Sequence, residues 1–177
     1  MSTSTVNPKA GPVAAFALSD SMQQRFAVEV AKYPADQRQS AVMACLAIVQ
    51  QLHSHVTAEA EHAVADYLGM APIAVREVTT FYNMYNQRPV GRFKLNVCTN
   101  LPCQLRDGER ALQHLCQRLG IEPGGTSADG LFTVQQSECL GACADSPVLL
   151  VNDRQMVSLM TNERLDDLVE TLKQQAI

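Results

Sequence analysis

The chain has 177 residues, of which 46% are hydrophobic and 18% charged, a globular composition that excludes a disordered or collagen-like protein. Fourteen basic and eighteen acidic residues give a net charge of −4, which argues against binding to nucleic acid or to an anionic membrane surface. The longest wholly apolar run, Ala41 to Val49, is far shorter than the ~18 residues of a transmembrane helix. We therefore expect no membrane span and a protein as the partner.

Residues 1–18 are predicted to form a mobile tail. The apolar stretch 11–18 has the length of a signal peptide, but a single basic residue, Lys9, precedes it. The chain has six cysteines, too few for a disulfide scaffold. We therefore expect reduced thiols in a reducing compartment, which is the cytoplasm.

Residues 19–88 are predicted to form a helical domain. Apolar periodicity and capping residues place its helices at 20–32, 36–52, 57–69 and 72–85. The second of these helices should be buried, because one apolar stripe runs along it and neighbouring residues widen that stripe. The stripe consists of Ala41, Cys45, Ile48 and Leu52.

Three aromatic residues lie close together at the end of the fourth helix. Phe81 and Tyr85 are one turn apart and are expected in the core of the helical domain. Part of the cluster that they form with Tyr82 and Met84 is expected to stay exposed and to be covered by a partner.

Residues 89–177 are predicted to form a compact α+β or α/β domain with the order β-α-β-β-α. Arg92–Val97 alternates strictly between polar and apolar residues, as a half-buried strand does. Leucines at helical spacing, from Leu105 to Leu119, predict one helix over 104–119. The remaining elements are expected at 131–135, at 148–151 as a strand buried on both faces, at 155–159 as a short last strand, and from Asn162 as the final helix.

Four of the six cysteines form two close pairs. Cys98 and Cys103 follow the first predicted strand, and Cys139 and Cys143 precede the buried strand at 148–151. In an α/β layer both loops can emerge at one edge of the sheet, so the two pairs can converge on one site. Four thiolates at one site repel each other unless a cation neutralises them, which indicates zinc or an iron–sulfur cluster.

The spacing of these cysteines leaves both kinds of centre open. It differs from the plant-type ferredoxin run C-x4-C-x2-C, and zinc sites commonly use loops of about two to four residues. Disulfides are disfavoured by the lack of an export signal. Cys45 and Cys116 lie on apolar helical stripes and are interpreted as core residues. His53, His55, His62 and His114 have no cysteine at ligand spacing and are interpreted as surface residues.

Several motifs then make the chain similar to a known family. They are VCTNLPC at 97–103, DGLFT at 129–133, ECLGAC at 138–143 and ADSPV at 144–148, and in the first half KYP at 32–34, VTTFYNMY at 78–85 and RPVG at 88–91. Together they resemble the thioredoxin-like 2Fe–2S ferredoxin family, to which the E subunits of NADH-quinone oxidoreductases, respiratory complex I, belong. The resemblance covers about residues 31–172.

This resemblance implies a helical domain followed by a thioredoxin-like domain that carries one 2Fe–2S cluster on Cys98, Cys103, Cys139 and Cys143. It also implies a partner subunit that holds FMN and binds NADH, within a larger respiratory complex peripheral to the inner membrane. Within-pair ligation, with Cys98 and Cys103 on one iron, is the simpler geometry for short loops. Pro147, which introduces the buried strand, is expected to follow a cis peptide bond, as thioredoxin-like folds often have one there.

Other functions remain as alternatives. Equivalent subunits serve NAD-linked hydrogenases and formate dehydrogenases, and a zinc-stapled interaction module would have no redox role. Residues 57–84 also resemble a helix-turn-helix, but Arg76 and Glu77 cancel in charge and the preceding helix is acidic, so DNA binding is disfavoured. The sequence contains no G-x-G-x-x-G motif, so the nicotinamide chemistry is expected in the partner.

Overall fold

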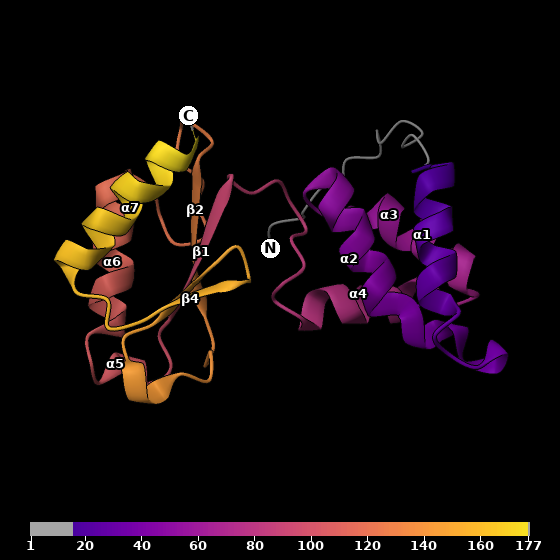
Figure 1. Cartoon of the computed structure of the whole chain (residues 1–177), viewed down its shortest axis with the longest axis horizontal. Helices are drawn as coiled ribbons and strands as arrows, with labels where there is room; N and C mark the ends of the chain where they lie inside the picture. The colour runs from indigo at the N-terminus through magenta and orange to yellow at the C-terminus, as the bar shows by residue number, and fades with distance from the viewer. Residues whose placement is uncertain (1–15, 177) are drawn as a thin grey trace, which may run out of the picture. The chain divides into compact units, whose positions relative to one another are not determined.

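The computed structural model describes residues 16–176, which form two compact units divided between Arg88 and Pro89 (Figure 1). Each unit has its own buried apolar core. Among residues 16–176, no helix combines the length and the apolar character that crossing a membrane requires.

The first unit is helical. It contains α1 (Asp20–Val30), the 3-10 helix η1 (Ala35–Ala41), α2 (Val42–His53), α3 (Ala58–Leu68) and α4 (Pro72–Phe81). Ser19 caps α1 by accepting a hydrogen bond from the Met22 amide, and Thr57 caps α3 in the same way through the Ala60 amide. Gly69 ends α3 in the left-handed conformation, as predicted. The helices predicted from periodicity are therefore present in this unit.

Two predicted helices of this unit differ from the structure. The segment predicted as one helix over 36–52 is η1 followed by α2, and Leu52 is exposed rather than part of the buried stripe. The fourth helix ends at Phe81 instead of continuing to Tyr85. Because the chain leaves the helix there, Phe81 is 79% exposed and its expected place in the core is wrong, whereas Tyr85 is buried as predicted.

Part of the predicted mobile tail is packed against the helical core. Residues 1–15 lie outside the described residues, but Phe16 and Leu18 contact the buried cluster. The Phe16 ring meets the His53 ring edge to face, with 4.9 Å between the ring centroids. Phe16 and Leu18, which the sequence placed in the tail, are therefore partly buried against the helical core.

The second unit joins a four-stranded mixed sheet to a layer of helices, which gives the predicted α+β architecture. Its elements are β1 (Phe93–Cys98), α5 (Leu101–Gln104), α6 (Gly108–Leu119), β2 (Phe132–Ser137), η2 (Cys143–Asp145), β3 (Leu149–Val151), β4 (Gln155–Val157) and α7 (Asn162–Ala176). The strand order is β2-β1-β3-β4, with β1 parallel to β2 and antiparallel to β3. The short strand β4 pairs with β3 and confirms the short last strand that was expected within 155–159.

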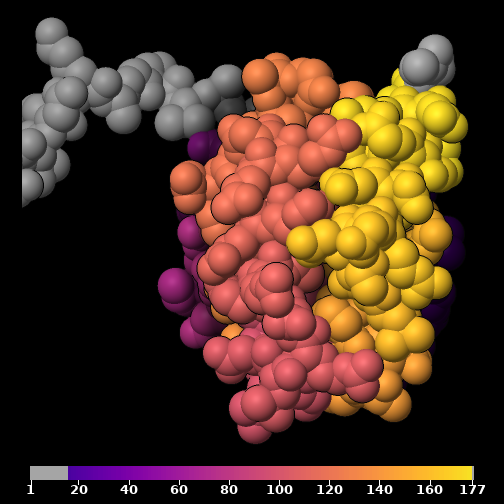
Figure 2. All heavy atoms as spheres, turned by 90° about the vertical axis from the view of Figure 1, so that its left-hand side faces the viewer, coloured from indigo at the N-terminus to yellow at the C-terminus, as the bar shows by residue number. Residues whose placement is uncertain are grey.

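Two helices cover one face of this sheet. Figure 1 shows α6 and α7 on one side of the sheet, and Figure 2 shows the two helices side by side. Phe93, Leu95 and Val97 of β1 share one buried cluster with apolar residues of both helices. Arg92 donates hydrogen bonds to the main-chain oxygens of Gln175 and Ala176, so the last turn of α7 is tied to the residue before β1.

The strand β1 is buried along its whole length, so the prediction of a half-buried strand is wrong. Lys94 and Asn96 are 2% and 3% exposed. The turn after β3 brings Asp153 over them: its carboxylate lies 2.6 Å from Lys94 Nζ and accepts a 2.6 Å hydrogen bond from Asn96 Nδ2. The buried polar groups of Lys94 and Asn96 thus have a partner in the Asp153 carboxylate.

The predicted helix over 104–119 is broken into α5 and α6. Asp107 has a positive φ of 67°, which interrupts the helix before Gly108. Leu105 lies in this break and is 78% exposed instead of sharing the stripe of Leu112 and Leu115. A second difference concerns β3, where Leu150 is only partly buried although both faces were expected to be covered.

Candidate metal centre

The parallel pairing of β1 and β2 brings the two cysteine loops to one edge of the sheet. Cys98 is the last residue of β1 and lies opposite Ser137, the last residue of β2. Cys103 follows in α5, Cys139 lies two residues beyond Ser137, and Cys143 begins η2. The convergence expected from the order of strands and loops is therefore present.

The two pairs differ in their access to solvent. Cys98 and Cys103 are each 1% exposed and pack against Val148. Cys139 and Cys143 are exposed, and their sulfurs lie 3.5 Å apart. The site thus has a buried inner pair and an exposed outer pair.

The pKa shifts place the four sulfurs in one electrostatic environment. Burial raises the pKa of the Cys98 thiol, against the opposing effect of hydrogen bonds from the backbone amides of Asn100 and Leu140. The pKa of Cys143 is raised first by its hydrogen bond with Cys139, and further by the charges of the other three cysteines. Negative charge on the Cys143 sulfur is therefore disfavoured by its cysteine neighbours, as expected of a site that binds a cation.

Three residues without a sulfur hold the cysteine segments in place. Ser146 donates to the Cys143 carbonyl at 2.6 Å, and its hydroxyl lies 3.3 Å from Cys103 Sγ. Asn100 accepts from the Leu101 amide at the start of α5 and donates to the Glu138 carboxylate at 2.7 Å, which links the two loops. The Ser146–Pro147 peptide bond is cis, as predicted.

Gly108, the first residue of α6, packs directly against both inner cysteines. A Cβ at this position would lie 2.8 Å from the carbonyl oxygens of Cys98 and Cys103, a distance that real Cβ atoms do not show. Sequence reasoning missed these supporting residues. Asn100 before Leu-Pro matches a helix cap, whereas nothing in the sequence marks Gly108 as a contact of both cysteines.

The donor set fits a two-iron centre. Across residues 16–176, no three or more cysteine, histidine, aspartate or glutamate side chains form a group that could hold one metal ion. A 2Fe–2S cluster takes four thiolates, two at each iron. The buried pair and the exposed pair together supply the four thiols that such a cluster needs.

The remaining cysteines and histidines lie elsewhere. Cys45 and Cys116 are buried in the cores of the two units, as interpreted from the sequence, and burial raises the pKa of Cys45 to about 12. His53 and His62 are exposed. His114 is half-buried and its Nε2 lies 3.0 Å from Asp166 Oδ1 of α7, so it joins two helices.

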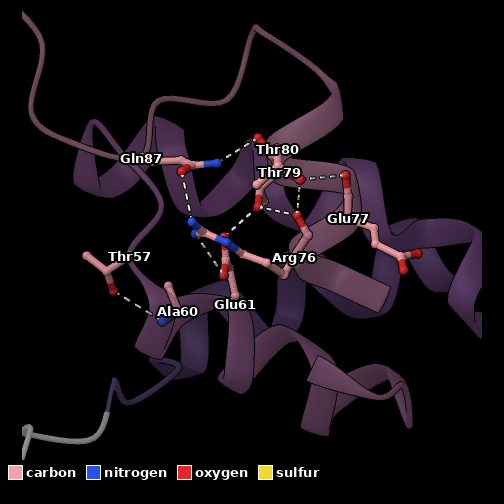
Figure 3. Close-up of polar contacts among 8 residues, drawn as sticks. All are labelled: Thr57, Ala60, Glu61, Arg76, Glu77, Thr79, Thr80 and Gln87. Carbon is pink, nitrogen blue, oxygen red and sulfur yellow. Dashed lines mark hydrogen bonds and ion pairs between the residues drawn. The ribbon is translucent and has the colours of Figure 1, made fainter. Parts of the chain in front are cut away.

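The segment that resembles a helix-turn-helix contains a polar network (Figure 3). Glu61 of α3 is buried, and its carboxylate accepts from Arg76 at 3.1 Å and from Thr79 at 2.5 Å. Arg76 also donates to Gln87, which in turn donates to the Thr79 carbonyl. Arg76, the cation of the supposed recognition helix, is thus paired with Glu61 of α3, which weakens the DNA-binding interpretation further.

Comparison with known proteins identifies the family of the chain. The model of the family described as thioredoxin-like [2Fe-2S] ferredoxin matches residues 26–173. NADH-quinone oxidoreductase subunit 2 of Thermus thermophilus is 40% identical over 81% of this chain and 79% of that protein. The E 2 subunit of the NADH-quinone oxidoreductase of Rhizobium meliloti is 40% identical over 86% of this chain and 89% of that protein.

A solved structure shares the fold. The NAD+-reducing [NiFe]-hydrogenase in its air-oxidized state aligns with a TM-score of 0.62 and 24% identity, over 73% of this chain but only 23% of that one. At this identity the likeness concerns the fold alone. The family match spans most of the sequence and includes all four clustered cysteines, so the chain belongs to the thioredoxin-like [2Fe-2S] ferredoxin family.

Proposed function

We propose that Cys98, Cys103, Cys139 and Cys143 hold one 2Fe–2S cluster, which exchanges single electrons with the FMN of a partner subunit that binds NADH. Membership of the family and the relatives named NADH-quinone oxidoreductase subunits make the chain a 2Fe–2S electron-transfer subunit of that enzyme. The observation that carries the ligand assignment is the gathering of two thiol pairs at one sheet edge. Within-pair ligation is the geometry we propose.

The residues around the site favour a cluster with a low reduction potential and with one side open to solvent. A 2Fe–2S cluster with four cysteine ligands supplies one-electron chemistry at potentials of about −400 mV in plant-type centres. Burial of Cys98 and Cys103 disfavours added negative charge, whereas the amides of Asn100 and Leu140 stabilise charge on the Cys98 sulfur. The exposed pair, Cys139 and Cys143, marks the side on which electrons enter or leave.

A flavin partner follows from the electron count. NADH gives two electrons as a hydride, whereas this kind of cluster takes one, so a flavin must divide the pair. The chain has no G-x-G-x-x-G motif for a dinucleotide. We therefore assign the nicotinamide chemistry to the partner subunit and electron transfer to this chain.

The parent complex is proposed from the relatives. Two relatives at 40% identity are named as NADH-quinone oxidoreductase subunits, whereas the hydrogenase resembles the chain at 24% identity. We favour the quinone-reducing complex and place the chain on the cytoplasmic side, peripheral to the inner membrane. An NAD-linked hydrogenase is the second candidate, because its solved structure shares the fold.

Anaerobic purification of the chain, alone and together with its flavin-bearing partner, tests this proposal. We expect a red-brown protein with about two irons and two sulfides per chain. NADH should bleach the cluster only when the flavin subunit is present. A colourless protein that contains zinc, or bleaching by NADH without the flavin subunit, would contradict the proposal.

A further inference from the structure

The outer pair of cysteines is open to solvent, whereas the inner pair is buried. Cys139 and Cys143 are both exposed, with their sulfurs 3.5 Å apart. A disulfide has an S–S distance of about 2.05 Å, so closing the bond requires the sulfurs to approach by roughly 1.5 Å. The two thiols are therefore close to bonding distance and open to a reagent in solution.

The loop between these cysteines has room to make that movement. Gly141 lies between them with a φ of 83°, and a Cβ built there would meet no atom within 4 Å. Neither Cys139 nor Leu140 belongs to a helix or strand, and Cys143 only begins the short η2. A small change of this loop leaves the sheet untouched.

The inner pair is protected from the same reaction. Cys98 and Cys103 are each 1% exposed, so a dissolved oxidant does not reach their sulfurs. Cys98 is held in β1 and donates its amide to the Val148 carbonyl. The Cys103 sulfur lies 3.3 Å from the hydroxyl of buried Ser146.

We propose that, in the cluster-free chain, Cys139 and Cys143 form a disulfide by exchange with a small dissolved disulfide, whereas Cys98 and Cys103 remain thiols. One outer thiolate attacks a sulfur of oxidised glutathione and releases one glutathione thiolate. The second outer thiolate then attacks the mixed disulfide and releases another. Two protein thiols are oxidised and one glutathione disulfide is reduced to two thiols, so electrons and protons balance.

This reaction gives the cluster site a reversible blocked state. The disulfide removes two of the four thiols that the proposed ligand set needs, so insertion of a cluster must wait for a reductant. The inner thiols stay available, because they never meet the oxidant. The consequence for cluster insertion rests on the proposed function, whereas the disulfide itself does not.

Peptide mapping of the cluster-free full-length chain, treated with oxidised glutathione, tests the pairing directly. Trypsin leaves Cys139 and Cys143 together in the peptide Leu119–Arg154, and Cys98 and Cys103 together in Leu95–Arg106. We expect the mass of Leu119–Arg154 to fall by two hydrogens, while Leu95–Arg106 stays reduced. A bridge within Leu95–Arg106, a cross-link between the two peptides, or only stable glutathione adducts would overturn the proposal.

A variant pair and a reconstitution assay complete the test. Cys143→Ser should trap a glutathione adduct on Cys139, whereas Cys116→Ala should still form the bridge. Iron and sulfide should be taken up by the reduced chain and at least about tenfold less by the oxidised chain, with recovery after dithiothreitol. Equal uptake by both forms would overturn the blocked state. If the disulfide forms but even the reduced chain takes up no cluster, the proposed function fails and the disulfide stands.

Discussion

The Tyr85 hydroxyl donates a 2.8 Å hydrogen bond to the main-chain carbonyl of Met43, which ties the segment after α4 to the start of α2. Tyr85 is 6% exposed. Burial raises its pKa from the ordinary value of 10 to about 12, and the neighbouring Tyr82 and Cys45 add to the effect. The neutral phenol is therefore the form that stabilises the helical unit.

This shift predicts a loss of stability in alkali. Because the folded pKa lies above the ordinary value of 10, the contribution is complete below pH 10 and disappears as the pH rises towards about 12. A shift of this size corresponds to about 2–3 kcal/mol. Urea unfolding measured between these pH values should show a decline to which buried Cys45 also contributes, and Tyr85→Phe should remove the part that belongs to Tyr85. An unchanged pH dependence in the variant would assign the effect to other groups.

The buried carboxylate of Glu61 provides a second prediction, on stability alone. Glu61→Gln keeps the size of the side chain but removes the charge that pairs with Arg76, whose side chain is 42% exposed. We expect the free energy of unfolding to fall by about 1–2 kcal/mol, discounted for the exposure of the partner. Glu77→Gln is the matched control, because Glu77 is exposed and its carboxylate points away from the network (Figure 3). Equal effects in both variants would rule out the ion pair as the cause.

The ligand assignment is tested by a cysteine scan. Alanine at Cys45 or Cys116 should leave the visible spectrum intact, because both thiols lie in the cores away from the site. Alanine at Cys98, Cys103 or Cys143 should remove or strongly alter it, because each variant leaves one iron short of a ligand. Absorption and electron paramagnetic resonance spectra of purified variants provide the measurement. Loss of colour in either core variant would contradict the assignment.

An exposed aromatic group at the end of α4 is predicted to dock on the flavin subunit. Tyr82 is 37% exposed and its ring contacts that of Phe81, which is 79% exposed. Tyr82→Asp should weaken association at least about tenfold, since it puts a charge in an apolar contact, and should leave the cluster spectrum unchanged. Tyr33→Asp is the control, because Tyr33 is 40% exposed elsewhere on the unit. Titration calorimetry with the flavin subunit should separate the two variants, and normal binding by Tyr82→Asp would place the interface elsewhere.

Exposed leucines beside Cys103 predict a second contact, on the cluster side. Leu101 and Leu105 are 63% and 78% exposed on either side of that cysteine. Leu101→Asn removes apolar contact area, so it should slow reduction of the cluster by the NADH-reduced flavin subunit about tenfold through weaker docking. Because the substitution adds no charge, the reduction potential of the cluster should not change. Val28→Asn is the control at the same 63% exposure. Stopped-flow bleaching gives the rate, and equal rates in the two variants would exclude a contact at Leu101.

Local patterns in the sequence were enough to place most helices and strands, and they failed where tertiary contacts override them. Strict alternation predicted Lys94 and Asn96 on an exposed face, but Asp153, distant in sequence, covers both. Helical spacing placed Leu105 on a buried stripe, yet the helix breaks at Asp107. Periodicity describes one element at a time, so it does not contain these contacts.

The cysteine site was predictable because topology and residue chemistry agree. Parallel neighbouring strands end at one edge, so loops after Cys98 and Ser137 had to meet there. The difference between a buried and an exposed pair was not predictable from spacing. It arises from Val148 and the partly buried Leu140 and Ala142, which cover the inner sulfurs and leave the outer ones open.

The space at Gly108, between the two inner cysteine segments, is too small for a methyl group. A Cβ at Gly108 would lie 2.8 Å from the carbonyl oxygens of both inner cysteines, so any side chain there must push apart the two segments that carry Cys98 and Cys103. A residue that offers no ligand atom therefore limits how the two inner cysteine segments can pack. The absence of a Cβ at Gly108 is therefore as necessary to the packing of this site as the presence of the cysteines.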